Sequence, residues 1–457
     1  MILMKDTPQI LTKIVSTKEG EIKALYQTYD IENLKKEVVR SPLSFYDKLA
    51  STQGKFFITE FKRKSPSAGW INKEVAIEKQ LQQYKDLGTN AVSVLTDYLY
   101  FGGTYDDLEK ASAFLQDTDI CILNKEFVID EIQVYLARKF GAHIILLIAA
   151  ILETEQFIHL KNVAESLGMG VIAEVHNLEE YQKIETATCK VLGINNRNLN
   201  NFKTAINNCN YIANNINHTG YIIAESGMAS ALDLAITGKH AKGFLIGTSL
   251  MQQDLNLPNK ETKSYFFKAC GIREAAHLKE NLADLMGVNF SPISKRKVDF
   301  KILNKVQIRR NMVPVFYQNA EAEILEILEK YNFEYVQLYA NDVSFEFIQQ
   351  LKKRVILAIR WQGLEDLKLV ERYAPFVDLF ILDAPKPGGG KQIESPIPND
   401  FPYPFLLAGG INIDNAKDVL KYDNCIGIDV ASGIEKDGVV DLGKSLALSR
   451  FFSELVY

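Results

Sequence analysis

The sequence predicts two consecutive (β/α)8 barrels, and three observations lead to this fold class. Short apolar, β-branched runs recur along the chain, and a segment with helical periodicity follows each of them. The runs form two successive sets of eight, and the polar stretch QQDLNLPNKETK (252–263) separates the sets. Because parallel strands need crossover helices and eight strand–helix units close a sheet without edges, each set is expected to form a closed α/β barrel of the TIM type.

Extra helices are expected before the first strand. Residues 8–50 contain apolar residues at helical spacing, at Ile10 and Ile14 and again at Leu34 and Val38, and they contain no strand-like run. We interpret this segment as helices that cover one end of the first barrel.

The first eight strands and their crossover helices follow in order. Between the first two runs, Ile77, Leu81, Tyr84 and Leu87 fall on one helical stripe, and Gly88 stands where a helix ends in a left-handed residue. The predicted strands are FFITEF (56–61), AVSVLT (91–96), ICIL (120–123), HIILLI (143–148), GVIAEV (170–175), VLGIN (191–195), YIIAES (221–226) and GFLIG (243–247).

The same alternation begins again after the polar stretch. The second set reads FFKACGI (266–272), LMGVNF (285–290), VPVFY (313–317), YVQLY (335–339), VILAIRW (355–361), LFILD (379–383), FLLAGG (405–410) and GIDVASG (427–433). We therefore expect one barrel in residues 1–255 and the other in residues 264–457. An open doubly wound sheet is disfavoured, because no GxGxxG turn follows either first strand and sixteen strands would overload one open sheet.

Composition limits the class of protein. The chain has 457 residues, 47% of them hydrophobic, which is enough for full cores. A net charge of −5 and a pI near 5.8 provide no basic surface for nucleic acid. The longest apolar run, 144–152, is shorter than the roughly 18 residues of a membrane span, and the N-terminus lacks a signal-peptide core. We expect a cytoplasmic protein that binds neither nucleic acid nor membrane; the sequence does not determine its oligomeric state, and a monomer is the working expectation.

The cysteines suggest neither a disulfide framework nor a metal site. Cys121, Cys189, Cys209, Cys270 and Cys425 are odd in number, widely spaced and without a CxxC pair. They are expected to be reduced thiols.

Polar residues gather at the strand ends of the first half, where such barrels carry their chemistry. Glu60 and Lys62 project to the same side, because side chains alternate along an extended chain. A surface ion pair would explain that pair alone. The other strand-end residues are Lys125, Glu174, Asn195, Arg197, Glu225 and Ser226. Two lysines and three carboxylates on one rim would push their pKa values apart and supply acid and base partners.

The second half has different chemistry at its strand ends. Cys270 ends the first strand and Asp383 ends the sixth. Lys268 shares the face of Cys270, which would favour the thiolate, and Asp383 could donate a proton across the barrel. A free cysteine is more often an inert buried thiol, but the strand-end position favours a functional role. Arg296, in the loop after the second strand, could bind a carboxylate through two hydrogen bonds, although a loop arginine is more often solvated.

Small residues that expose backbone N–H groups end the last strands of both halves, which is the usual phosphate position in such barrels. In the first half they are AESG (224–227) and LIGTS (245–249). In the second half they are AGGI (408–411) and VASGIE (430–435), with Gly409, Gly410, Ser432 and Gly433 as the candidates.

The motifs themselves resemble two enzyme families. The first half is similar to indole-3-glycerol-phosphate synthases in ILTKIVSTKEGEI, EFKRKSPS, LTDYLYFGG, LNKEF, IAEV, GINNRNL, AESGM and FLIGTSLM. The second half resembles phosphoribosylanthranilate isomerases in KACGI, SPISKR, YVQLY, LLAGGI and DVASGIE, although Tyr339 stands where that family usually has histidine and PKPGGGKQIESP lacks the usual aromatic pattern. Together the likenesses cover nearly the whole chain, which resembles the fused bifunctional enzyme of tryptophan biosynthesis.

For the second half, the resemblance implies an Amadori rearrangement of N-(5-phosphoribosyl)anthranilate to 1-(2-carboxyphenylamino)-1-deoxyribulose 5-phosphate. Asp383 would protonate the ring oxygen of the ribose. Cys270 would then remove the proton from the second sugar carbon, and Arg296 would hold the anthranilate carboxylate.

For the first half, the resemblance implies closure of the pyrrole ring of that product, with loss of carbon dioxide and water. Lys125 would be the general acid, Glu174 the acid or base of dehydration, and Lys62 the group that holds the substrate carboxylate. Glu60 would orient the lysines. Further substrate contacts would come from Ser65, Phe101, Asn195, Arg197, Glu225 and Ser226, and phosphate contacts from Gly227, Gly247 and Thr248. No metal or organic cofactor is expected, since proton transfers and electrostatics suffice.

Two alternatives remain at this point. A sugar isomerase of histidine biosynthesis also has two phosphate loops, but that chemistry usually needs two aspartates at strand ends one and five, which this chain lacks. Alternatively, the second barrel is a degenerate scaffold or binding module beside an active synthase.

Overall fold

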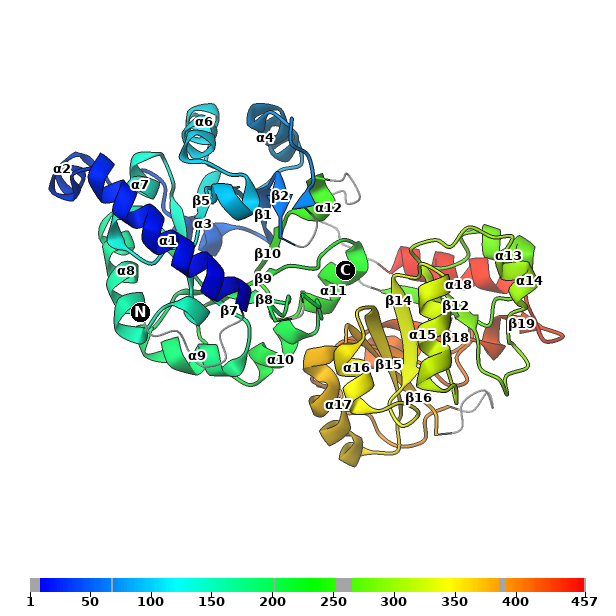
Figure 1. The fold of residues 1–457 in the computed structure, drawn as a ribbon. Coiled ribbons are helices and arrows are strands. Elements are labelled where there is room, and N and C mark those ends of the chain that lie inside the picture. The colour runs from blue at the N-terminus through cyan, green and yellow to red at the C-terminus, as the bar shows by residue number, and fades with distance from the viewer. Residues whose placement is uncertain (1–8, 67–68, 201, 252–264, 386–391, 456–457) are drawn as a thin grey trace. The chain divides into compact units, whose positions relative to one another are not determined.

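The computed structural model describes residues 9–66, 69–200, 202–251, 265–385 and 392–455 (Figure 1). The expected linker 252–263 and part of the segment 385–396 lie outside these residues. Two compact units are present: the first comprises residues 1–204, 215–234 and 240–260, and the second comprises residues 205–214, 235–239 and 261–457.

The first set of strands closes into a parallel barrel, in the order β1-β10-β9-β8-β7-β6-β5-β4. Its strands are β1 (Phe56–Phe61), β4 (Ala91–Leu95), β5 (Cys121–Lys125), β6 (Ile144–Ile148), β7 (Gly170–Val175), β8 (Val191–Asn195), β9 (Tyr221–Glu225) and β10 (Gly243–Ile246). The short strands β2 (Lys64–Ser65) and β3 (Gly69–Trp70) form a hairpin after β1. The closed barrel confirms the predicted fold and shows that the open-sheet alternative is wrong.

Extra helices precede the first barrel, as predicted; from residue 9 onward they are α1 (Gln9–Thr28), α2 (Ile31–Glu37) and α3 (Phe45–Ser51). Phe45 packs edge-to-face on Phe56, at the start of β1, with ring centroids 5.8 Å apart. A Cβ at Gly170, the first residue of β7, would overlap the Phe45 ring. Helix α3 therefore covers the N-terminal end of the barrel, which is opposite to the rim where chemistry is expected.

Helices follow the strands of the first barrel. They are α4 (Ile77–Asp86), α5 (Tyr98–Phe101), α6 (Tyr105–Leu115), α7 (Glu131–Lys139), α8 (Thr154–Ser166), α9 (Leu178–Ile184), α10 (Asn208–Asn214), α11 (Ala231–Thr237) and α12 (Thr248–Met251), with 3₁₀ turns η1 (Ala149–Ile151) and η2 (Glu185–Ala187). Ile77, Leu81 and Tyr84 are buried, as expected, and Gly88 has φ +74°. Leu87, which follows on the same stripe, is 38% exposed. It caps the C-terminus of α4, where the chain turns away from the core.

The second set of strands closes into another parallel barrel, in the order β11 to β18. Its strands are β11 (Phe266–Cys270), β12 (Leu285–Asn289), β13 (Met312–Val315), β14 (Tyr335–Tyr339), β15 (Arg354–Arg360), β16 (Leu379–Asp383), β17 (Phe405–Leu407) and β18 (Cys425–Val430). A hairpin of β19 (Glu435–Lys436) and β20 (Val439–Val440) follows. The predicted second barrel is thus confirmed as well.

Shorter helices connect the second set of strands. They are α13 (Ala275–Lys279), α14 (Phe300–Leu303), α15 (Glu321–Lys330), α16 (Phe345–Gln350), α17 (Leu367–Tyr373) and α18 (Leu442–Glu454), with 3₁₀ turns η3 (Leu364–Asp366), η4 (Ala374–Phe376), η5 (Ala416–Lys421) and η6 (Ser432–Ile434). All five cysteines of the chain are free thiols, as expected. Within the described ranges, no helix combines the length and the apolar character needed to cross a membrane.

Candidate active sites

Glu60 and Lys62 lie at the end of β1, on the predicted rim of the first barrel. The Nζ atom of Lys62 is 2.6 Å from Oε1 of Glu60, and Glu60 is 5% exposed. Burial alone would raise the pKa of Glu60, but the ammonium groups of Lys62 and Lys125 outweigh it and leave the pKa below its ordinary value. Glu60 is therefore an anion that faces both lysines, as the strand alternation predicts.

Lys125, at the end of β5, lies between two buried carboxylates. Its Nζ is 2.9 Å from Oε2 of Glu174 and 2.7 Å from Oε2 of Glu225. Burial disfavours the ammonium form, but the two carboxylates more than compensate and raise the pKa of Lys125. The rim therefore presents a protonated lysine with an acceptor on each side.

The two carboxylates beside Lys125 differ in proton affinity. Burial and the neighbouring charge of Glu174 raise the pKa of Glu225 to about 7, against the opposing effect of Lys125. For Glu174, burial is outweighed by Lys125 and by His176, and its pKa is lowered. Glu174 therefore favours the carboxylate form, while Glu225 binds a proton more readily than an ordinary glutamate.

His176 belongs to this site but was missed in the sequence. Its Nε2 is 3.2 Å from Oε1 of Glu174, and its Nδ1 is 2.9 Å from Oε2 of Glu180. Burial alone would lower the pKa of His176, but the two carboxylates raise it to about 10. The signal was present, because His176 follows Glu174 by two positions at the end of β7.

Of the remaining candidates of the first rim, Asn195 contacts this centre directly. Asn195 donates from Nδ2 to Oε1 of Glu174 at 3.2 Å, and its own Oδ1 accepts from the backbone N–H of Arg197 at 3.0 Å. Ser226 follows β9 directly with φ +63°. Ser65 is buried in β2, and Phe101 ends α5.

The predicted phosphate loop of the first half packs closely against Glu60. A Cβ at Gly247 would lie 2.7 Å from Oε1 of Glu60, so a larger residue here would displace the Glu60 carboxylate. Gly227 has φ +91°, which favours glycine. Thr248 begins α12, and its side chain lies outside the described part of the chain.

A cavity of about 530 Å³ opens on the second barrel. Its lining includes most of the candidates from that half: Cys270, Arg296, Asp383, Gly409, Gly410 and Ser432, together with Tyr339 and Asp429. Gly433 is not among the lining residues. A Cβ at Gly433 would overlap the carbonyl oxygen of Ile411, so this glycine allows two loops to approach each other.

The expected thiolate character of Cys270 is not found. Lys268 lies 3.4 Å from its sulfur, as the spacing predicted, but the same ammonium group is only 2.8 Å from Oδ1 of Asp429. Burial and the charge of Asp429 raise the pKa of Cys270 to about 11, and Lys268 offsets this only in part. These surroundings favour the thiol form of Cys270.

Asp383 has the character of a general acid. Burial and the charge of Asp429 raise its pKa to about 6. Oδ1 of Asp383 accepts from the backbone N–H of Ala384 at 2.8 Å, and Oδ2 accepts from the hydroxyl of Tyr339 at 3.3 Å. Tyr339, which departs from the family pattern, thus contacts the acid directly.

Arg296 forms the bidentate pair that its sequence position suggested, but with a carboxylate of the protein. Its Nε and Nη2 donate to the two oxygens of Glu435, at 2.6 and 2.8 Å. Gly271 has φ +82°, and a Cβ there would lie 2.6 Å from Cδ of Arg296. The arginine is therefore held beside Cys270 and oriented for a planar anion.

Comparisons with known proteins cover both halves. A family model described as indole-3-glycerol phosphate synthase matches residues 11–262, and one described as N-(5'phosphoribosyl)anthranilate isomerase matches residues 267–449. The chain is 32% identical over 443 residues to the tryptophan biosynthesis protein TrpCF of Vibrio parahaemolyticus, with 93% of this chain and 90% of that protein covered. For TrpCF of Haemophilus influenzae the identity is 34% over 470 residues, with 96% of each covered. A crystal structure of phosphoribosyl anthranilate isomerase from Thermus thermophilus matches 41% of this chain and 98% of its own, with 26% identity and a TM-score of 0.34.

Proposed function

The chain belongs to the family of fused indole-3-glycerol-phosphate synthases and phosphoribosylanthranilate isomerases, and from that premise we propose which side chains carry its two reactions. It is a bifunctional enzyme of tryptophan biosynthesis that acts on phosphorylated small molecules. The C-terminal half isomerises N-(5-phosphoribosyl)anthranilate, and the N-terminal half converts the product to indole-3-glycerol phosphate. The residue assignment rests on the gathering of acid and base groups at one rim of each barrel.

Each activity resides in its own part of the chain, the synthase in residues 1–255 and the isomerase in residues 264–457. Expressed separately, each fragment is expected to be soluble, to unfold cooperatively and to retain its own activity, because each barrel has a closed sheet. Steady-state assays and thermal melts of both fragments check this. If neither fragment is soluble, the boundary is wrong or the two parts depend on each other.

The isomerase reaction begins at the ribose ring oxygen. Asp383 gives its proton to that oxygen as the bond to the first sugar carbon breaks, which leaves an iminium ion. Cys270 removes the proton from the second carbon, and the resulting enol-amine tautomerises to the ketone. Arg296 exchanges Glu435 for the anthranilate carboxylate. With the acid and the thiol facing one cavity, the scaffold-only alternative for the second barrel is not favoured.

The raised pKa of Cys270 is compatible with this role. The iminium ion adds a positive charge beside the sulfur after ring opening, and a positive charge favours the thiolate. Lys268 contacts the same sulfur at 3.4 Å and acts in the same direction. The thiol proton passes to Asp383, which is a carboxylate after ring opening and lines the same cavity, so the thiolate base forms after Asp383 has acted.

The isomerase is expected to lose activity as the pH rises through about 6, the pKa of Asp383. The acid form is active, and above its pKa the protonated fraction falls about tenfold per pH unit. The hydrogen bond from Tyr339 lowers this pKa, so Tyr339→Phe should move the descending limb of kcat/KM to higher pH.

The matched control is Tyr317→Phe. Tyr317 packs on Tyr339 with ring centroids 5.1 Å apart, but the described contacts of its hydroxyl do not include Asp383. Its pH profile should coincide with that of the wild type. An unshifted limb in Tyr339→Phe would remove Asp383 as the titrating acid or Tyr339 as its partner.

In the synthase reaction, Lys62 binds the substrate carboxylate near the carbon that closes the ring, and Lys125 protonates the ketone oxygen. Carbon dioxide leaves from the ring-closed intermediate, and water leaves in the last step. Glu174 is the anionic base, held by His176 at 3.2 Å. Glu225, with a pKa of about 7, supplies or accepts the second proton. Glu60 keeps both lysines charged.

Lys62→Ala is expected to raise KM and to lower kcat of the synthase. The variant loses ground-state affinity for the carboxylate, and a misplaced carboxylate also costs rate through orientation. Steady-state kinetics on the deoxyribulose phosphate measure both effects, with Lys79→Ala, an exposed lysine of α4, as the control. If Lys62 were only an ion-pair partner, its loss would leave the buried Glu60 without its ammonium group and lower the Tm, but it would leave the kinetics of the folded enzyme unchanged.

A further inference from the structure

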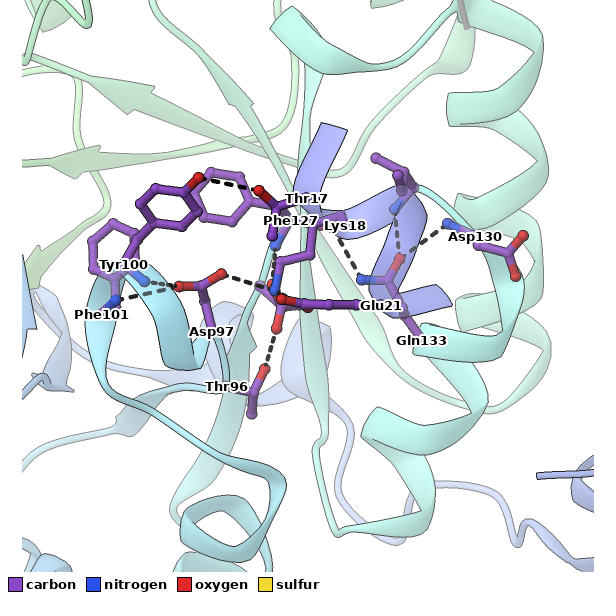
Figure 2. A network of polar contacts seen from close by, with 12 residues as sticks. Thr17, Lys18, Glu21, Thr96, Asp97, Tyr100, Phe101, Phe127, Asp130 and Gln133 are labelled. Atoms are coloured by element: carbon purple, nitrogen blue, oxygen red, sulfur yellow. Dashed lines mark hydrogen bonds and ion pairs between the residues drawn. The ribbon is translucent and has the colours of Figure 1, made fainter. Parts of the chain in front are cut away.

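Lys18 is a buried charge that neither reaction uses. It lies in α1 and is 2% exposed, and its Nζ is 2.7 Å from Glu21, 2.8 Å from Asp97 and 3.0 Å from Glu126 (Figure 2). Burial alone would lower the pKa of Lys18, but the charges of Glu126 and Asp97 raise it. A lysine that is fully paired in this way is charged at any working pH.

Two of the carboxylates that pair with Lys18 lie in loops at the C-terminal ends of the strands of the first barrel. Asp97 is the second residue after β4, and Glu126 follows Lys125, the last residue of β5. Oδ1 of Asp97 accepts from the backbone N–H groups of Tyr100 at 2.7 Å and Phe101 at 3.2 Å, and so caps α5 (Figure 2). Oδ2 of the same carboxylate faces Lys18. One side chain therefore joins α1 to the helical turn that carries Phe101.

A second set of contacts leads to the same ring. Thr17 of α1 lies 3.2 Å from the Tyr100 hydroxyl, oxygen to oxygen. Thr96 donates to Oε2 of Glu126 at 2.8 Å. The ring of Phe127, the residue after Glu126, lies 6.0 Å from that of Phe101 between centroids. Helix α1 is thus connected to Phe101 through the loop after β4 and through the loop after β5.

Docking of α1 does not by itself require a buried lysine. Leu11, Ile14 and Val15 are each 2% exposed and give the helix an apolar face. Replacement of buried ion networks by apolar residues of similar volume is often neutral or stabilising, so the stability of the docked helix does not explain the lysine. The contacts of this network connect Lys18 to the cap of α5 and to the ring of Phe101.

We propose that Lys18 is a positioning residue of the synthase reaction, which holds Phe101 against the aromatic ring of the substrate through Asp97 and the cap of α5. The proposal rests on the role given to Phe101 above. Without the ammonium group, the Asp97 carboxylate loses its partner and turns away from α1, the cap weakens, and the ring loses its fixed orientation.

Lys18→Met should raise the synthase KM about tenfold, which corresponds to about 1.4 kcal/mol of binding free energy, with a smaller loss of kcat. The isomerase kinetics of the same polypeptide should not change. Lys23→Met, an exposed lysine of the same helix, should behave like the wild type. A lower Tm with wild-type KM at a temperature well below that Tm would overturn the proposal.

A double-mutant cycle with Phe101→Ala separates positioning from general destabilisation. In the Phe101→Ala background, Lys18→Met should change the synthase KM little further. If the effects of the two substitutions on KM are additive, Lys18 does not act through Phe101, and its proposed role is wrong while that of Phe101 stands. A Phe101→Ala enzyme with wild-type KM would instead remove the proposed role of Phe101, and that of Lys18 with it. If Lys18→Met does not fold, Asp97→Asn takes its place in the cycle, because asparagine keeps an N-cap acceptor but removes the charge.

Discussion

Lys125→Ala is expected to lower the kcat of the synthase about 100- to 10,000-fold, the usual contribution of a general acid. The substrate KM should change much less, because the proton is donated mainly in the transition state. The isomerase activity of the same polypeptide should stay at the wild-type level. Assays of both reactions on one purified variant measure this contrast.

The position of Lys125 makes a folding control necessary. Its removal leaves Glu174 and Glu225 buried without their shared ammonium group, and the pKa of Glu225, already about 7, should rise further. One proton would then be shared by the two carboxyl groups, as in other buried acid pairs. Circular dichroism and a thermal melt establish that the barrel is intact. A folded variant with near-wild-type kcat would show that Lys125 is only an ion-pair partner.

Cys270→Ala and Asp383→Asn should each reduce isomerase turnover by about 100-fold or more, since each removes one of the two proton-transfer groups. Synthase activity should remain near that of the wild type. The alanine cannot accept the proton of the second sugar carbon, and the amide cannot donate to the ring oxygen.

Cys425→Ala is the matched control for the thiol. Cys425 is a buried cysteine of β18 whose pKa is raised to about 12, and it does not line the isomerase cavity. Its replacement should affect stability more than turnover. Near-normal isomerase rates in Cys270→Ala or in Asp383→Asn would exclude that residue from the mechanism.

The strands and rims could be predicted from the sequence because both depend on local patterns. FFITEF (56–61), GVIAEV (170–175), VLGIN (191–195), YVQLY (335–339) and LFILD (379–383) have the predicted bounds. The alternation of side chains then places Glu60 beside Lys62. Other strand ends differ by one to three residues, since small residues such as those of AGGI (408–411) extend a run without joining the ladder.

The electrostatics of the rims could not be predicted in the same way. The spacing of Lys268 and Cys270 predicts that the ammonium group favours the thiolate. However, barrel closure pairs β11 with β18 and sets Lys268 opposite Asp429 in register. The register between distant strands decides which charged groups lie near Cys270 and therefore whether its pKa rises or falls. The local sequence pattern does not determine that register. The contacts of Lys18 with two rim loops are of the same long-range kind.

The most direct test of two independent sites on one chain is complementation between inactive variants. Lys125→Ala retains only the isomerase, and Cys270→Ala retains only the synthase. Supplied with N-(5-phosphoribosyl)anthranilate, each alone should form almost no indole-3-glycerol phosphate, and a mixture of the two should form it after a lag while the deoxyribulose phosphate accumulates. A mixture that forms none, although each variant keeps its single activity, would contradict the account, as would either variant completing both steps alone.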